Sequence, residues 1–113
     1  MENRNEEMAF LTMPDYETQI IEILRSTSSP IITKSRLEAF HENDIAQIMD
    51  KLTVQERKKL YCLLDSDFLS GIFEYIEADK AVDYLNEMDV HKCADVISNL
   101  ETDTAVEFLR AVE

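Results

Sequence analysis

Residues 42–113 read "ENDIAQIMDKLT VQERKKLYCLLD SDFLSGIFEYIE ADKAVDYLNEMD VHKCADVISNLE TDTAVEFLRAVE", which is six consecutive units of twelve residues. At the fourth, seventh, eighth and eleventh places of each unit, 23 of the 24 residues are apolar, and Arg57 is the only exception. These places follow the spacing i, i+3, i+4, i+7, which puts them on one face of an α-helix. The pattern predicts one short amphipathic helix in every unit.

The helix must therefore end once in each unit. In a continuous helix, twelve residues at about 100° each would turn the apolar stripe by about 120° per unit and spread it around the surface. Thr and acidic residues suit such breaks, because they cap the following helix or complement its dipole. The residues at the unit ends are Thr53, Asp65, Glu77, Asp89 and Glu101. Thr53 followed by Glu56 also predicts a capping box.

The expected fold is all-α. Helices of about ten residues are marginal alone, so each must bury its stripe against its neighbours. We therefore predict a right-handed or left-handed superhelical array of short helices, an armadillo-like solenoid. One Gly and two Pro in 113 residues leave few turn signals for a β-sandwich or barrel. This length is enough for one small domain.

The region ahead of the six units predicts two more helices. Tyr16, Ile20, Ile23 and Leu24 have helical spacing, "STSSP" at 26–30 reads as a loop, and Pro30 suits the first turn of the next helix. Residues 1–14 have no period and are expected to form a flexible N-terminal tail ahead of a domain at residues 15–113. Without a signal peptide or a run of 18 apolar residues, the chain is expected to stay in the cytosol.

The composition argues against several function classes. A net charge of -13 repels polyanions and opposes nucleic-acid binding, but it favours cations or a basic partner. We expect no enzyme, because His91 and Cys93 face different directions on a predicted helix and the single Gly71 cannot form a phosphate loop. His41 and His91 lack spaced zinc-binding partners and are expected at helix ends or on the surface. Cys62 and Cys93 are too few for a disulfide framework.

Acidic residues dominate the C-terminal half. Residues 60–113 hold thirteen Asp or Glu against three Lys or Arg, a net charge of -10. Asp103 and Glu107 lie four residues apart and therefore share a helix face away from the apolar stripe. Their spacing alone favours ordinary solvated acids at a helix start. A cation would relieve the repulsion between them.

The residues from Ala39 to Leu109, beginning "AFHENDIAQIMDKLT", resemble the N-terminal cytosolic domain of MgtE-type magnesium transporters. His41 and Asp44 match the His-Pro-x-Asp opening of that family, with Glu42 in place of the usual Pro. The likeness covers nearly everything after Tyr16 and implies a superhelix of short helices. In such transporters two CBS domains, a connecting helix and a membrane-spanning channel follow, and the full-length protein is a homodimer.

The resemblance implies a regulatory, magnesium-sensing role at the cytoplasmic face of the cell membrane. Magnesium ions bind between acidic faces of this domain and the CBS domains and hold the pore shut. Aligning the units places Asp103 and Glu107 where the family has carboxylates that face the CBS domains. A third family acid falls on Gly71, with Glu74 or Asp67 of the same helix as replacements. Because half of each site would lie elsewhere, the chain alone should bind magnesium weakly or not at all.

Two other interpretations remain open. Similar arrays resemble parts of flagellar motor switch proteins and armadillo-like scaffolds, which suggests a protein-interaction module. A partner would then dock on the concave face and contact the basic cluster Arg57 to Lys59 or the acidic rim. The chain is also compatible with an acidic solenoid that has no role in ion binding.

Overall fold

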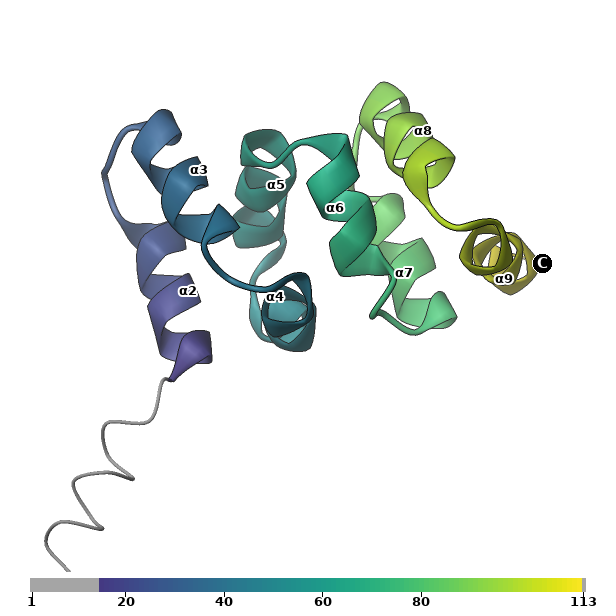
Figure 1. The fold of residues 1–113 in the computed structure, drawn as a ribbon, viewed down its shortest axis with the longest axis horizontal. Coiled ribbons are helices and arrows are strands. Elements are labelled where there is room, and N and C mark those ends of the chain that lie inside the picture. Colours follow the sequence, from purple (N-terminus) through teal and green to yellow (C-terminus); the bar gives the residue numbers. More distant parts are fainter. Residues whose placement is uncertain (1–14, 113) are drawn as a thin grey trace, which may run out of the picture.

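The structure is a computed structural model that describes residues 15–112, and this part of the chain contains helices and no strands (Figure 1). The prediction of an all-α fold is therefore confirmed. The elements are α2 (Tyr16–Arg25), α3 (Pro30–Glu38), α4 (Glu42–Ile48), the 3-10 helix η1 (Met49–Lys51), α5 (Val54–Leu63), α6 (Ser66–Phe73), α7 (Ala78–Leu85), α8 (Val90–Asn99) and α9 (Thr102–Val112). The predicted tail at residues 1–14 lies outside the described residues.

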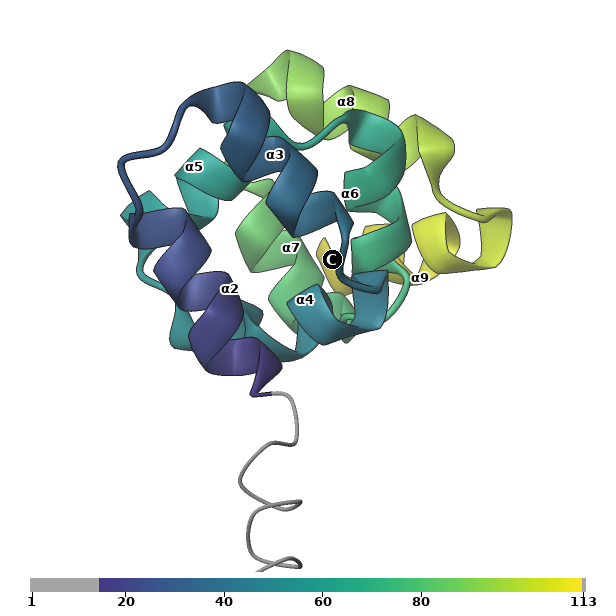
Figure 2. The ribbon, with the colours of Figure 1, turned by 60° about the vertical axis from the view of Figure 1, so that its left-hand side comes forward.

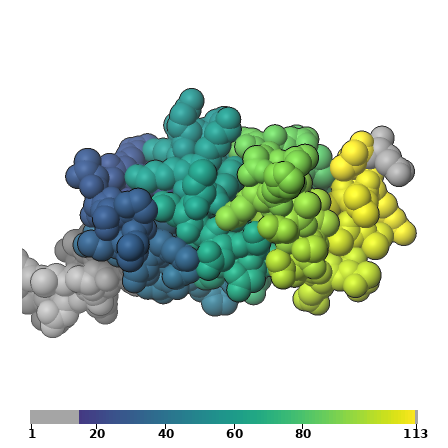
Figure 3. Space-filling view, turned by 90° about the horizontal axis from the view of Figure 1, so that it is seen from above, coloured from purple at the N-terminus to yellow at the C-terminus, as the bar shows by residue number. Residues whose placement is uncertain are grey.

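The helices form an elongated row, in which most of the packing joins helices two apart in the sequence. α2 packs on α4, α4 on α6, α6 on α8, α3 on α5 and α7 on α9, and α2 also packs on α3 and α5. The row runs from α2 at one end to α9 at the other (Figures 1 and 2), and the space-filling view shows the same progression (Figure 3). This arrangement is an array of short helices as predicted, and its superhelical form, including the hand, stays a prediction.

Every predicted break lies at the start of a helix. Thr53, Asp65, Glu77 and Asp89 are the N-caps of α5, α6, α7 and α8. The capping box is present, because the hydroxyl of Thr53 accepts from the Glu56 backbone N–H at 3.1 Å and Glu56 Oε1 accepts from the Thr53 N–H at 2.9 Å. Asp65 and Glu77 make no side-chain cap bond.

The apolar stripes form one continuous core. All stripe residues of the six units are buried or half-buried except Leu109 and Val112 on α9, which are 58% and 66% exposed. Ile20 and Leu24 of α2 and Leu37 of α3 extend the same core towards the N-terminal end of the row. An apolar groove of about 140 Å³ between α7, α8 and α9 adjoins the two exposed residues.

Arg57, the polar exception in the stripes, is paired at every nitrogen. Its side chain is only 11% exposed, and its Nε and Nη2 donate to the two carboxylate oxygens of Glu87 at 2.9 and 2.8 Å. Nη1 donates to the carbonyls of Met49 and Leu52 at 3.0 and 2.7 Å, and the guanidinium lies 4.9 Å from the centre of the Tyr84 ring. The residue therefore ties α5 to the end of η1 and to the end of α7.

Candidate functional site

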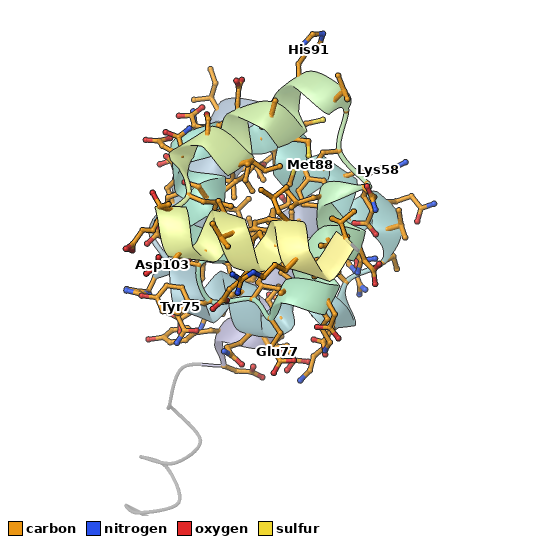
Figure 4. The ribbon with its side chains drawn as sticks, turned by 90° about the vertical axis from the view of Figure 1, so that its right-hand side faces the viewer. Lys58, Tyr75, Glu77, Met88, His91 and Asp103 are labelled. Carbon is orange, nitrogen blue, oxygen red and sulfur yellow. The ribbon has the colours of Figure 1, made fainter. Side chains whose placement is uncertain are left out.

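Asp103 and Glu107 lie on one exposed face of α9. Asp103 is the second residue of the helix and Glu107 is one turn further on, so their Cβ atoms lie about 6 Å apart. Both residues are exposed, and neither carboxylate has a hydrogen bond or ion pair with another described side chain or backbone group. Asp103 lies at the outer edge of the molecule, on the same side as Tyr75 (Figure 4). The two acids therefore share one exposed helix face, and their role as metal ligands stays a prediction.

The start of α9 is held by Glu74, which follows directly after α6. Its Oε2 accepts from the Glu101 backbone N–H at 2.7 Å, and its Oε1 accepts from the Thr104 hydroxyl. The turn that carries Asp103 is thus bonded to a residue about 30 positions earlier in the chain. The sequence suggested Glu74 only as a replacement ligand, whereas the structure shows that both of its oxygens are already bonded within the protein.

The carboxylate of Glu42 lies over Gly71. Glu42 begins α4, which packs on α6, and a Cβ added to Gly71 would overlap the Glu42 carboxyl group. The two departures from the family pattern, Glu42 for Pro and Gly71 for an acid, therefore meet in space. The spacing of acids along the chain does not point to Glu42, although the occurrence of both departures in one chain is a signal that they are close in space. Asp67, the other suggested replacement, is exposed and accepts from the Phe68 N–H at 2.9 Å.

The histidines and cysteines lie at the start of α4 and on α5 and α8, and none belongs to α9. His41 is the N-cap of α4, where its Nδ1 accepts from the Asn43 N–H at 3.0 Å, and His91 is exposed on α8 (Figure 4). Both positions agree with the expectation of helix-end or surface residues. Cys62 and Cys93 are free thiols. Burial raises the pKa of Cys93, so this thiol is less reactive than an exposed one.

The acids form open surfaces instead of a closed metal cage. Within residues 15–112, no group of three or more His, Cys, Asp or Glu side chains is placed to hold a metal ion. Mg²⁺ is commonly bound through one or two carboxylates while it keeps several waters. An exposed pair such as Asp103 and Glu107 fits that chemistry as one half of a shared site, and it lacks the nitrogen and sulfur ligands that zinc favours.

Across the described helices, none has the length and apolar character needed to cross a membrane.

A family model described as the MgtE intracellular N domain matches residues 40–113. No curated protein and no solved structure matched the chain in the corresponding comparisons. The matched range contains all six twelve-residue units, and with them Gly71, Asp103 and Glu107. The chain therefore belongs to the family of MgtE intracellular N domains.

Proposed function

We propose that this chain is the regulatory, magnesium-sensing domain of a magnesium transporter, and that it closes against downstream CBS domains when magnesium is bound. The observation that carries the proposal is the pair Asp103 and Glu107, two exposed carboxylates on α9 that have no partner among the described residues. Family membership supplies the context, because the matched model describes the MgtE intracellular N domain. The full-length transporter would be a homodimer at the cytoplasmic face of the membrane.

Asp103 and Glu107 would hold the ion, and Glu42 would supply the carboxylate at the position of Gly71. A bound magnesium ion would contribute positive charge between two acidic surfaces. The residues of this chain would hold it through carboxylate oxygens and leave the remaining positions to water and to the facing domain. Without the ion, the net charge of -13 favours separation from another acidic surface. Magnesium stabilises the closed state relative to the separated state only by the difference between its binding free energies to the two states.

Calorimetric titration with MgCl₂ tests this proposal on the 113-residue chain and on a longer protein that includes CBS domains. We expect little heat with the chain alone and measurable binding with the longer protein. Replacing Asp103 and Glu107 together by Ala should remove that gain. Asp79→Ala with Asp83→Ala is a matched control, because these acids are also exposed and four residues apart, on α7. Equal affinity in the short and long proteins, or no loss in the Asp103/Glu107 variant, would contradict the proposal.

A protein-interaction module is the second candidate, and the apolar groove between α7, α8 and α9 favours it. Leu109 and Val112 line this groove and are more than half exposed, as expected for a surface that a partner covers. Leu109→Asp should then abolish capture of a stoichiometric partner at every magnesium concentration. A partner whose binding depends on magnesium and on Asp103 would instead support the sensing function.

A further inference from the structure

Glu74 bridges two helices that are not main packing partners of each other. It is the C-cap residue of α6, which packs on α4 and α8, whereas α9 packs on α7. The Glu74 carboxylate reaches across to accept from the Glu101 N–H and the Thr104 hydroxyl at the start of α9. A helix start has N–H groups without partners inside the helix and carries a partial positive charge, so a carboxylate is well suited to this place.

The two residues that Glu74 binds lie on either side of Asp103. Glu101 precedes the helix and its carbonyl accepts from the Ala105 N–H at 2.9 Å, while Thr104 lies directly after Asp103. Fixing Glu101 and Thr104 therefore fixes the direction of the first turn of α9. Glu107 follows one turn later on the same rigid helix, so its position depends on the same anchor.

We propose that Glu74 is a positioning residue: it holds the first turn of α9 so that Asp103 and Glu107 face a cation together, and it does not bind the cation itself. The part of this proposal that concerns the ion rests on the proposed function. Both oxygens of Glu74 are engaged within the protein, whereas those of Asp103 and Glu107 have no described partner.

Two conservative substitutions separate positioning from ion binding. Glu74→Gln removes the charge but keeps an oxygen that accepts from the Glu101 N–H and an amide that can donate to Thr104. Glu74→Asp keeps the charge but is one methylene shorter and cannot reach both groups. If Glu74 is a positioning residue, Gln should preserve both the anchoring of α9 and ion binding, whereas Asp or Ala should weaken both. If Glu74 is a ligand, Gln should weaken ion binding, because a neutral amide lacks the charge that attracts Mg²⁺.

The experiment uses nuclear magnetic resonance on the 113-residue chain, with Mn²⁺ as a paramagnetic probe that binds oxygen ligands. Amide hydrogen exchange of Glu101, whose N–H is bonded to Glu74, and of residues 105–108, whose N–H groups are bonded within the helix, measures the anchoring of α9. Broadening of the Asp103 and Glu107 signals measures ion binding. We expect Glu74→Gln to match the unaltered chain in amide exchange and in signal broadening. Glu74→Ala and Glu74→Asp should exchange on the order of tenfold faster, as for loss of a helix cap, and should show less broadening.

Glu77→Gln and Glu77→Ala are the matched controls, because Glu77 precedes α7 and makes no side-chain cap bond. Unchanged exchange in Glu74→Ala would overturn the anchoring. Loss of broadening in Glu74→Gln, with exchange unchanged, would show that Glu74 is a ligand and overturn the positioning role. If Mn²⁺ leaves Asp103 and Glu107 of the unaltered chain unbroadened, which agrees with weak binding by one half of a shared site, the ion-binding comparison of Glu74→Gln with Glu74→Ala is made by magnesium titration of the longer protein that includes CBS domains. Amide exchange in the 113-residue chain still decides whether Glu74 anchors α9.

Discussion

At the scale of single residues, Arg57 shows the limit of pattern analysis. The sequence identified it as the one polar residue among the stripe positions and assigned it, with Lys59, to a basic cluster for partner contacts. In the structure its partner Glu87 lies 30 residues away, and Lys59 donates to the carbonyl of Leu24 at 2.5 Å. Periodicity predicts which face a residue occupies, but it carries no information on which distant group will satisfy a buried charge. Of the cluster, Lys58 is left exposed to solvent.

The Arg57–Glu87 pair should make stability depend on pH. Burial raises the pKa of Glu87, but hydrogen bonds from Arg57 and Tyr61 outweigh it and leave the pKa below its usual value of 4.5. A carboxyl with a lowered folded pKa stabilises the fold above its unfolded pKa, and this contribution is lost as the pH falls through the folded value. Glu87→Gln should therefore reduce the loss of unfolding free energy between about pH 7 and pH 3, measured by urea titration. Asp83→Asn is the exposed control, and an equal pH dependence in both variants would contradict the expectation.

Gly71 should tolerate a side chain. It lies inside α6 and does not have a positive φ, so Ala is compatible with its backbone. A glycine inside a helix costs up to about 1 kcal/mol relative to Ala. The three atoms nearest to an added Cβ all belong to the Glu42 carboxyl group, the end of a flexible side chain that can rotate away.

We therefore expect Gly71→Ala to raise the unfolding free energy in urea by as much as about 1 kcal/mol. In a Glu42→Ala background the gain should be at least as large, because no side chain has to move. A loss of stability in both backgrounds would show that Gly71 is required by the backbone.

At the scale of helices, the sequence predicted where each one begins, because capping is local. Thr53 with Glu56 and Asp89 with the His91 N–H are contacts within three residues, which a sequence displays directly. The structure adds caps that come from distant residues, which a sequence does not display. Lys92 Nζ donates to the Leu64 carbonyl at 2.7 Å, at the end of α5, and Glu74 holds the start of α9.

The two kinds of helix start should differ in their sensitivity to alanine. Thr53→Ala removes the hydroxyl that accepts from the Glu56 N–H, which is the N-cap half of the capping box, and should lower the unfolding free energy by about 1 kcal/mol. Glu77→Ala removes an N-cap side chain that makes no hydrogen bond, so it should cost a few tenths of a kcal/mol from the helix dipole alone. Urea unfolding followed by circular dichroism compares the two variants. Equal costs would mean that the cap bonds of Thr53 contribute nothing beyond charge and propensity.

At the scale of the whole molecule, the twelve-residue period predicted an array but not its packing. Each stripe can face a neighbour one or two helices away, and the choice depends on the rotation between helices, which a linear period does not contain. The structure shows that most of the packing joins helices two apart, whereas α2 also packs on α3 and α5. For the candidate site, spacing predicted that Asp103 and Glu107 share a face, whereas the approach of the Glu42 carboxylate to Gly71 depends on the packing of α4 on α6.

The position of a unit within the array should determine what its stripe contributes to stability. Leu85 and Leu109 occupy the same eighth place in the fourth and sixth units, yet Leu85 is 6% exposed and Leu109 is 58% exposed. Leu85→Ala should lower the unfolding free energy by about 2–4 kcal/mol, because it removes buried methyl groups and leaves a cavity. Leu109→Ala should cost less than about 1 kcal/mol, because most of this side chain already contacts solvent. Urea titrations of the two variants provide the comparison within one residue type and one repeat position.

Equal losses would mean that Leu109 is covered in solution, either by another copy of the chain or by a segment outside the described residues. A loss that depends on protein concentration would identify another copy of the chain.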